Sequence, residues 1–129
     1  MINIWVVLAI LFVHWVADFV FQTHEQSINK STSWSYLLEH TFLYSIIWFT
    51  AIPFIYSINY DLFIKPPIGL FILFAFITFI THTITDFYTS RINKILWDNK
   101  EVHNFFVSVG FDQYLHYIQL LVTYYILFK

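Results

Sequence analysis

Four long apolar stretches alternate with short polar connectors along this chain. They cover residues about 3–22, 35–57, 67–90 and 104–128, and each is close to the ~20 residues that an α-helix needs to cross a bilayer. The strict alternation typical of membrane β-strands is absent, so we expect helices. Short connectors make consecutive helices antiparallel neighbours. The pattern therefore predicts an all-α polytopic membrane protein, a single domain of residues 1–129 folded as a four-transmembrane-helix antiparallel bundle.

Two local features refine the second helix and the third connector. Pro53 lies near the end of the second stretch and is expected to kink that helix. The third connector runs from Ser90 to His103, and its apolar residues between Ile92 and Trp97 predict a short interfacial helix.

Positive charges are divided unevenly between the two ends of the predicted bundle. Connectors one and three carry more of them than the opposite end does: Lys30, Arg91, Lys94 and Lys100 against Lys65 and Lys129. By the positive-inside rule, connectors one and three are expected to be cytoplasmic, with both termini outside.

The composition supports a membrane location and narrows the kinds of site. Hydrophobic residues make up 59% of the chain and charged residues only 11%, whereas a soluble domain carries about a quarter charged residues. We therefore expect the lipid bilayer as a partner. The net charge of −2 and the lack of a basic stripe argue against nucleic acid. There is no cysteine, so a metal site has to use nitrogen and oxygen ligands.

Seven ionisable side chains interrupt the apolar stretches, where each one is costly. Six of them form pairs four residues apart, and this spacing places both members of a pair on one face of a helix. The pairs are His14 with Asp18, His82 with Asp86 and, in reversed order, Asp112 with His116, while His40 stands alone in the second stretch.

The order within each pair matters because neighbouring helices run in opposite directions. On the first and third helices the aspartate follows the histidine, whereas on the fourth helix both the order and the direction are reversed. All three aspartates should therefore lie nearer one membrane face, with the histidines about one helical turn deeper. This registry predicts one shared site inside the bundle.

A short internal match accompanies these pairs. The segments His14–Phe19 and His82–Phe87 share their histidine, aspartate and phenylalanine at the same spacing. Helices one and three run in the same direction, so the match predicts a two-fold internal repeat of helix pairs.

Three interpretations of the buried groups stay open. A divalent metal site fits the ligand types, either as one ion with surrounding partners or as two ions sharing a carboxylate. Histidine and aspartate chains also relay protons or bind a moving ion, and so small a transporter is expected to be a homo-oligomer. A polar core that only fixes helix packing is the third interpretation. In the metal interpretation the ion is Zn²⁺ or Mn²⁺ and the ligands are His14, Asp18, His40, His82, Asp86, Asp112 and His116.

Three further polar residues are candidates for binding substrate. Gln22 continues the face of Asp18 by one turn, and it either contacts substrate or faces water. Arg91 follows the third stretch and either holds a phosphate or only sets the topology. Gln113 adjoins Asp112 and is expected to orient it.

At these residues the chain resembles the bacterial membrane proteins grouped as domain-of-unknown-function family 3307. The matching segments are His14-x-x-x-Asp18-Phe19-x-x-Gln22-Thr23, then Lys30, His40, His82-x-x-x-Asp86-Phe87 and Asp112-Gln113-x-x-His116. The resemblance covers nearly the whole chain. It implies a bacterial or phage origin and a multi-pass domain in the inner membrane, but it supplies no activity. The chain is also distantly similar to LexA-regulated inner-membrane metal-dependent hydrolases, which likewise place histidine and aspartate in membrane helices.

The function that these observations favour is that of a membrane-embedded metal-dependent hydrolase. In this hypothesis a metal-activated water is the nucleophile, and Asp18 or Asp112 acts as general base. A site near one membrane face makes a phospholipid headgroup or another phosphoester the expected substrate. The alternatives are ion or proton transport and a non-enzymatic protein with a structural polar core.

Overall fold

The structure, a computed structural model, describes residues 3–61 and 67–128, and these residues form helices and no strand. In chain order the elements are α1 (Ile4–Trp15), the π-helix η1 (Val16–Val20), α2 (His24–Asn29), α3 (Trp34–Ser57), α4 (Ile68–Asp98) and α5 (Val102–Leu127). The all-helical prediction is confirmed for this part of the chain. Lys65 and Lys129, which entered the predicted orientation, lie outside the described residues.

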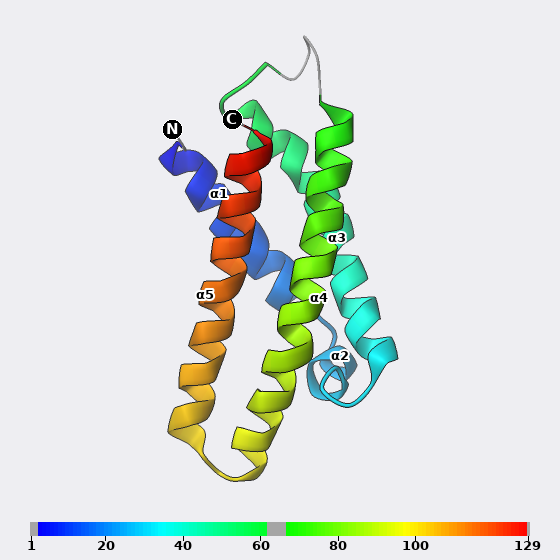
Figure 1. Cartoon of the computed structure of the whole chain (residues 1–129), viewed down its shortest axis with the longest axis vertical. Coiled ribbons are helices and arrows are strands. Elements are labelled where there is room, and N and C mark those ends of the chain that lie inside the picture. The colour runs from blue at the N-terminus through cyan, green and yellow to red at the C-terminus, as the bar shows by residue number, and fades with distance from the viewer. Residues whose placement is uncertain (1–2, 62–66, 129) are drawn as a thin grey trace.

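In Figure 1, α4 and α5 run lengthwise in opposite directions, and α1 passes obliquely behind α5. α4 packs against both α3 and α5, and α1 packs against α3 and α5. α2 lies in the lower half of this view, as does the turn between α4 and α5, while both chain ends lie near the upper end. Connectors one and three are therefore at the same end of the molecule, as the order of the helices predicts.

Residues 90–98 continue α4, so the prediction of a separate interfacial helix between Ile92 and Trp97 is wrong. No glycine or proline interrupts this segment, and the helix continues until Asn99. There Lys100 adopts a left-handed conformation with φ 62°, and the backbone N–H of Glu101 donates to the carbonyl of Leu96. These are the features of a Schellman motif, which ends the helix and turns the chain sharply into α5.

Connector one contains a short helix, α2, that the hydrophobic pattern did not predict. Its first turn is closed by a capping box, in which the Thr23 side chain accepts from the backbone of Gln26 and the Gln26 side chain accepts from the backbone of Thr23. Such reciprocal bonds satisfy two backbone donors at once. This helix fixes the path of the chain toward Lys30.

The first apolar stretch does not stay α-helical to its end. From Val16 the backbone widens into η1, and the N–H of Phe21 donates to the carbonyl of Val16. Short π-helical turns of this kind occur frequently at functional sites. Asp18 lies inside this turn and is buried. Pro53 lies within α3, which continues to Ser57.

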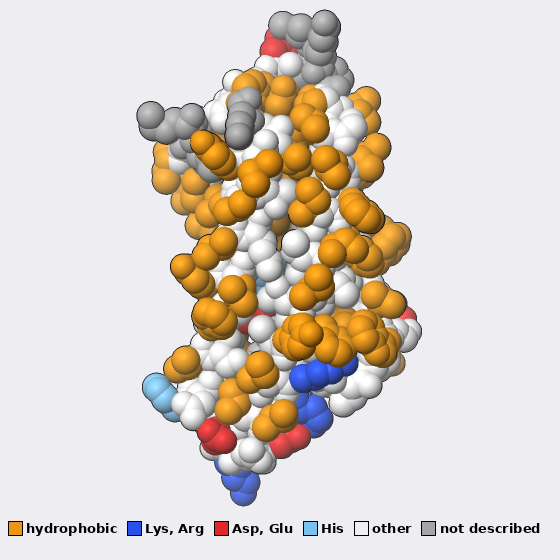
Figure 2. All heavy atoms as spheres, viewed as in Figure 1, with side chains coloured by type: hydrophobic (Ala, Val, Ile, Leu, Met, Phe, Trp, Pro, Cys, Tyr) orange, Lys and Arg blue, Asp and Glu red, His pale blue; other side chains and the backbone are white. Residues whose placement is uncertain are grey.

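The apolar core occupies the end of the molecule away from α2 and includes side chains that are fully buried, among them Val6, Ile10, Trp48, Ile52 and Phe74. Large apolar side chains are also exposed along every long helix, and Figure 2 shows them over much of one face. Lysine and arginine side chains gather toward the lower end of that view. Among the described helices, α3 and α4 are long and apolar enough to cross a membrane, and the apolar segment Ile4–Val20 is shorter.

Candidate metal centre and adjoining pocket

All seven ionisable residues singled out in the apolar stretches are buried, with at most 8% of any residue exposed. They come from five elements, of which only α1 and η1 directly adjoin in the sequence. The residues are His14 on α1, Asp18 on η1, His40 on α3, His82 and Asp86 on α4, and Asp112 and His116 on α5. The structure therefore brings these seven side chains together in one interior region, as the sequence predicts.

A compact group of four potential ligands lies at the centre: Asp18, His40, His82 and Asp86. The Nε2 atoms of His40 and His82 are 3.2 Å apart. His40 Nε2 lies 3.0 Å from Asp18 Oδ1 and 3.4 Å from Asp86 Oδ2, and the corresponding distances from His82 Nε2 are 3.5 and 3.7 Å. A tetrahedral ion with ligand distances of about 2.0–2.1 Å separates its ligand atoms by roughly 3.3 Å. Five of the six distances among the four ligand atoms are therefore close to those of such a tetrahedron.

A second group shares Asp18 with the first and adds Asp112 and His116. His116 Nε2 lies 3.3 Å from Asp112 Oδ1, but it also lies 3.1 Å from Asp86 Oδ1. On its other side, His116 Nδ1 is 3.2 Å from Nδ1 of His82. His116 therefore connects the central group to Asp112.

His14, also predicted as a ligand, joins neither group of potential ligands. Its Nε2 is 2.7 Å from Oε1 of Gln113, and its Nδ1 is 2.7 Å from the hydroxyl of Tyr44. Because the amide oxygen is an acceptor, Nε2 carries the proton and Nδ1 accepts from Tyr44. Both ring nitrogens of His14 are engaged in hydrogen bonds, so His14 orients Tyr44 and Gln113.

Gln113 joins the histidine and aspartate groups. While its oxygen accepts from His14, its Nε2 donates to Asp112 Oδ2 at 3.0 Å and to Asp18 Oδ2 at 3.3 Å. Asp112 also accepts a 2.6 Å bond from Thr89. The expected orienting role of Gln113 thus extends to both carboxylates.

Lys30 is a site residue that the hydrophobic pattern did not reveal, although it belongs to the resemblance motif. Its Nζ lies 2.7 Å from Asp86 Oδ2. Burial lowers the pKa of this amine, but the carboxylates of Asp86 and Asp18 raise it by more, so the pKa lies above the ordinary 10.5. Tyr44 was also missed. It lies one helical turn beyond His40, and its ring stacks on His82 with a centroid distance of 3.8 Å.

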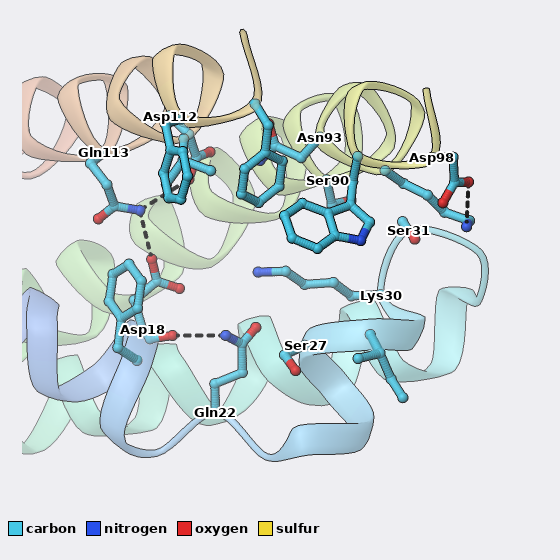
Figure 3. A pocket seen from close by; sticks show the side chains of 17 residues that line it. Asp18, Gln22, Ser27, Lys30, Ser31, Ser90, Asn93, Asp98, Asp112 and Gln113 are labelled. Atoms are coloured by element: carbon cyan, nitrogen blue, oxygen red, sulfur yellow. Dashed lines mark hydrogen bonds and ion pairs between the residues drawn. The ribbon is translucent and has the colours of Figure 1, made fainter. Parts of the chain in front are cut away.

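A cavity of about 690 Å³ adjoins the centre (Figure 3). Asp18, Asp112 and Gln113 lie at one end of it, and the Lys30 side chain extends into it from the opposite direction. Its remaining lining comes from η1, α2, α4 and α5 and from the segments that follow η1 and α2: Phe19, Gln22, Ser27, Ile28, Ser31, Ser90, Asn93, Lys94, Trp97, Asp98, Phe105, Phe106 and Val109. His82 and His116 face instead the interior space beside Tyr44. Asp18 and Asp112 thus lie at the cavity while these two histidines lie deeper, as predicted, but Asp86 is not among the lining residues.

The three predicted substrate residues have different surroundings. Gln22 and Gln113 line the cavity. Arg91 is not among its lining residues, because its guanidinium lies 3.6 Å from the ring centroid of Phe87 and donates to the Phe87 carbonyl. Lys30 lines the cavity and pairs with Asp86 of the candidate metal centre.

The two matching segments differ in local structure. His14–Phe19 passes from α1 into the π-helix, whereas His82–Phe87 lies wholly within α4. The predicted two-fold repeat therefore remains a prediction from the sequence.

The fold and site define a class: an all-helical protein with a buried histidine and aspartate cluster beside an open cavity. A family model described as "Protein of unknown function (DUF3307)" matches residues 6–129, and the chain belongs to that family. No curated protein and no solved structure matches it significantly.

Proposed function

We propose that the protein is a membrane-embedded, metal-dependent hydrolase with one divalent ion held by Asp18, His40, His82 and Asp86. The observation that carries this proposal is the set of five ligand-to-ligand distances between 3.0 and 3.7 Å around one point. Two imidazole nitrogens facing each other at 3.2 Å repel unless a proton or a cation lies between them. A cation satisfies both nitrogens together with the two carboxylates.

The charge balance of the site supports a divalent ion. Asp18, Asp86 and Asp112 bring three carboxylates, and Lys30 brings one ammonium group. With neutral histidines, two negative charges are left uncompensated in a buried region, which is strongly unfavourable. One divalent cation neutralises them. Two histidines and two carboxylates suit Zn²⁺ or Mn²⁺ among common ions.

The residues around the four ligands favour a defined geometry. Lys30 donates to the same Asp86 oxygen that faces the ion, while His116 lies against the other oxygen of Asp86. Gln113 donates to the outer oxygen of Asp18. His116 and Gln113 are outer partners of the kind that orient ligands and increase metal affinity, whereas Lys30 places a positive charge beside the ion.

Asp112 is the residue best placed to act as general base. It lines the cavity, it is outside the four-ligand group, and it is hydrogen-bonded to Thr89 and Gln113. A bound ion would supply a water of lowered pKa and would polarise the phosphoryl oxygen. Asp112 would accept the proton of this water as it attacks phosphorus, the ester P–O bond would break, and the proton would pass from Asp112 to the departing alcohol oxygen. His116, 3.3 Å from Asp112, would stabilise the change in protonation. A substrate enters through the cavity, and a phosphoester or lipid headgroup suits its position.

A multi-pass location in the bacterial inner membrane completes the proposal. Exposed apolar side chains extend along α1, α3, α4 and α5, which is unfavourable in water and favourable in lipid. The basic residues of connectors one and three lie at the cavity end, so this end is cytoplasmic by the positive-inside rule.

Ion or proton transport is the second candidate, and the chain of contacts from His82 through His116 to Asp112 favours it. Transport also requires a path to the opposite membrane face. The fully buried Trp48, Ile52 and Phe74 fill the interior on that side. This packing is the reason that hydrolysis is preferred.

Hydrolysis can be tested on the purified protein in lipid nanodiscs containing phosphatidylethanolamine and phosphatidylglycerol. The protein is stripped with a chelator, reloaded with Zn²⁺ or Mn²⁺, and supplied with phospholipid and soluble phosphoesters while ³¹P NMR follows the products. We expect metal-dependent turnover that Asp112→Asn reduces at least a hundredfold while the ion stays bound. A metal-loaded protein that hydrolyses nothing but conducts protons or divalent ions in proteoliposomes would establish the transport alternative.

A further inference from the structure

The cavity contains polar atoms that no described residue satisfies. Gln22 Oε1, Ser90 Oγ and Asn93 Oδ1 are buried without a hydrogen-bond partner, and all three residues line the cavity. Buried polar atoms are normally paired, and each unpaired one has a desolvation cost. Three of them around one cavity indicate that something else supplies their hydrogen bonds.

The orientation of the Gln22 amide defines what is missing. Its Nε2 donates to the backbone carbonyl of Asp18 at 3.1 Å, so the unpaired atom is the oxygen, an acceptor. The Asn93 oxygen is an acceptor as well, and the Ser90 hydroxyl can both donate and accept. A ligand that satisfies these atoms has to present O–H or N–H donors to Gln22 and Asn93.

A different chemistry is required beside Lys30. Its ammonium group pairs with Asp86 at 2.7 Å but reaches into the cavity, as Figure 3 shows, and it has further N–H groups to donate. Ser27 also lines the cavity, but its hydroxyl already donates to the backbone carbonyl of His24. The space beside the Lys30 ammonium group, next to the proposed ion, fits a phosphate or another anionic group.

Part of the cavity lining is apolar. Ile28, Trp97 and Phe106 belong to it, and each is more than half exposed despite its size. Phe105 and Val109 on α5 continue this lining. Such a wall suits hydrocarbon, and it continues the apolar surface of the helices. A volume of about 690 Å³ is within the range of sites for small organic ligands.

We propose that the cavity binds a phospholipid whose headgroup carries hydrogen-bond donors, such as phosphatidylethanolamine or phosphatidylglycerol. The phosphate lies by Lys30, the ammonium or hydroxyl groups of the headgroup donate to Gln22 and Asn93, and the acyl chains leave along Trp97 and Phe106. This assignment rests on the proposed function for its substrate role and narrows it to donor-bearing headgroups. Phosphatidylcholine is discriminated against, because its trimethylammonium group has no N–H and leaves both acceptors unpaired.

Native mass spectrometry of the detergent-purified, delipidated full-length protein can measure this selectivity. The protein is titrated with short-chain phosphatidylethanolamine, phosphatidylglycerol and phosphatidylcholine of equal chain length, and with glycerol phosphate. We expect the first two lipids to bind at least roughly tenfold more tightly than phosphatidylcholine. Gln22→Leu and Asn93→Leu should each reduce that preference severalfold. Gln119→Leu is the matched control, because that amide donates to Thr85 and does not line the cavity.

The outcomes separate this inference from the hydrolase proposal, because headgroup selectivity is measured by binding alone. Equal binding of the three lipids, or a preference unchanged in both variants, would overturn the inference even if the protein hydrolyses a soluble phosphoester. Glycerol phosphate binding as tightly as the lipids would also overturn it and assign the cavity to a soluble ligand. Selective lipid binding without turnover would support the inference and contradict the hydrolase proposal. The same titration of the chelated protein shows whether selectivity is independent of the ion, and we expect the order of the headgroups to persist.

Discussion

His82 and His116 face each other through their Nδ1 atoms at 3.2 Å, close enough to share one proton. If His82 Nε2 is a metal ligand, its Nδ1 carries the proton and donates to His116. His116 Nε2 then carries a proton too and donates to Asp86 Oδ1, 3.1 Å away. The same ring cannot also bind an ion through Nε2. The pair therefore favours one ion at the central group over two ions sharing Asp18.

The hydrogen bond between His82 and His116 predicts that replacing each of them affects metal binding differently. His82→Ala removes a ligand and should abolish metal binding. His116→Ala removes an outer partner and should weaken affinity by roughly 10- to 100-fold while the protein still binds one ion. Competition with a chelator of known affinity measures both. Equal and complete loss in the two variants would place His116 among the ligands and contradict the coupling.

Replacing Lys30 should lower the stability of the metal-free protein but raise its affinity for metal. Lys30→Met leaves Asp86 without its 2.7 Å partner, and the metal-free protein should lose about 2–3 kcal/mol of stability, less than for a fully buried pair. The same change removes a positive charge beside the ion, so affinity for Zn²⁺ should increase. Thermal unfolding in detergent with and without Zn²⁺ tests both parts. Lys94→Met is the control, because Lys94 pairs with the exposed Asp98. Weaker metal binding in Lys30→Met would contradict the electrostatic account.

The Lys30–Asp86 pair also predicts a pH dependence. The folded-state pKa of Lys30 is raised above 10.5, so its contribution to stability is fully present below pH 10.5 and is lost as the pH rises through the folded-state pKa. The stability difference between the wild-type protein and Lys30→Met should stay constant from neutral pH to about 10.5 and shrink above it. Unfolding measured across this interval tests the prediction, and a difference that already shrinks near pH 8 would refute it.

The turn between α4 and α5 offers a gain in stability. Lys100 has φ 62°, a region where residues with a Cβ are strained and glycine is not. Lys100→Gly should therefore stabilise the protein by about 1 kcal/mol. Asn99→Gly is the comparison, since φ at Asn99 is −79° and no such strain is relieved there. A lower melting temperature for Lys100→Gly than for the wild type would show that the motif is held by other contacts.

The sequence predicted the convergence of the site because spacing and helix direction together determine it. Pairs four residues apart share a helix face, and reversing both order and direction on the last helix keeps Asp112 and His116 in register with Asp86 and His82. What could not be predicted depends on helix rotation and on connector paths. The rotation of α1 places His14 against Tyr44 and Gln113 and outside the ligand groups.

Local geometry accounts for the remaining differences between the predicted and the observed structure. Lys30 lies in a connector, and its position depends on the capping of α2 by Thr23, which the pattern of apolar stretches does not reveal. The π-helix that contains Asp18 gives no periodic signal over so few residues. The third connector was predicted too long because polar residues after Ser90 can continue a helix as readily as end it.

The central claim is that one divalent ion binds to Asp18, His40, His82 and Asp86, and elemental analysis of the purified protein tests it most directly. After loading with Zn²⁺ or Mn²⁺ and removal of free metal, the account predicts one ion per chain, and less than a tenth of that in His40→Ala. His14→Ala should retain the ion, because neither ring nitrogen of His14 is available to it. A wild-type protein without stoichiometric metal, or a His40→Ala variant that binds as much as the wild type, would contradict the account.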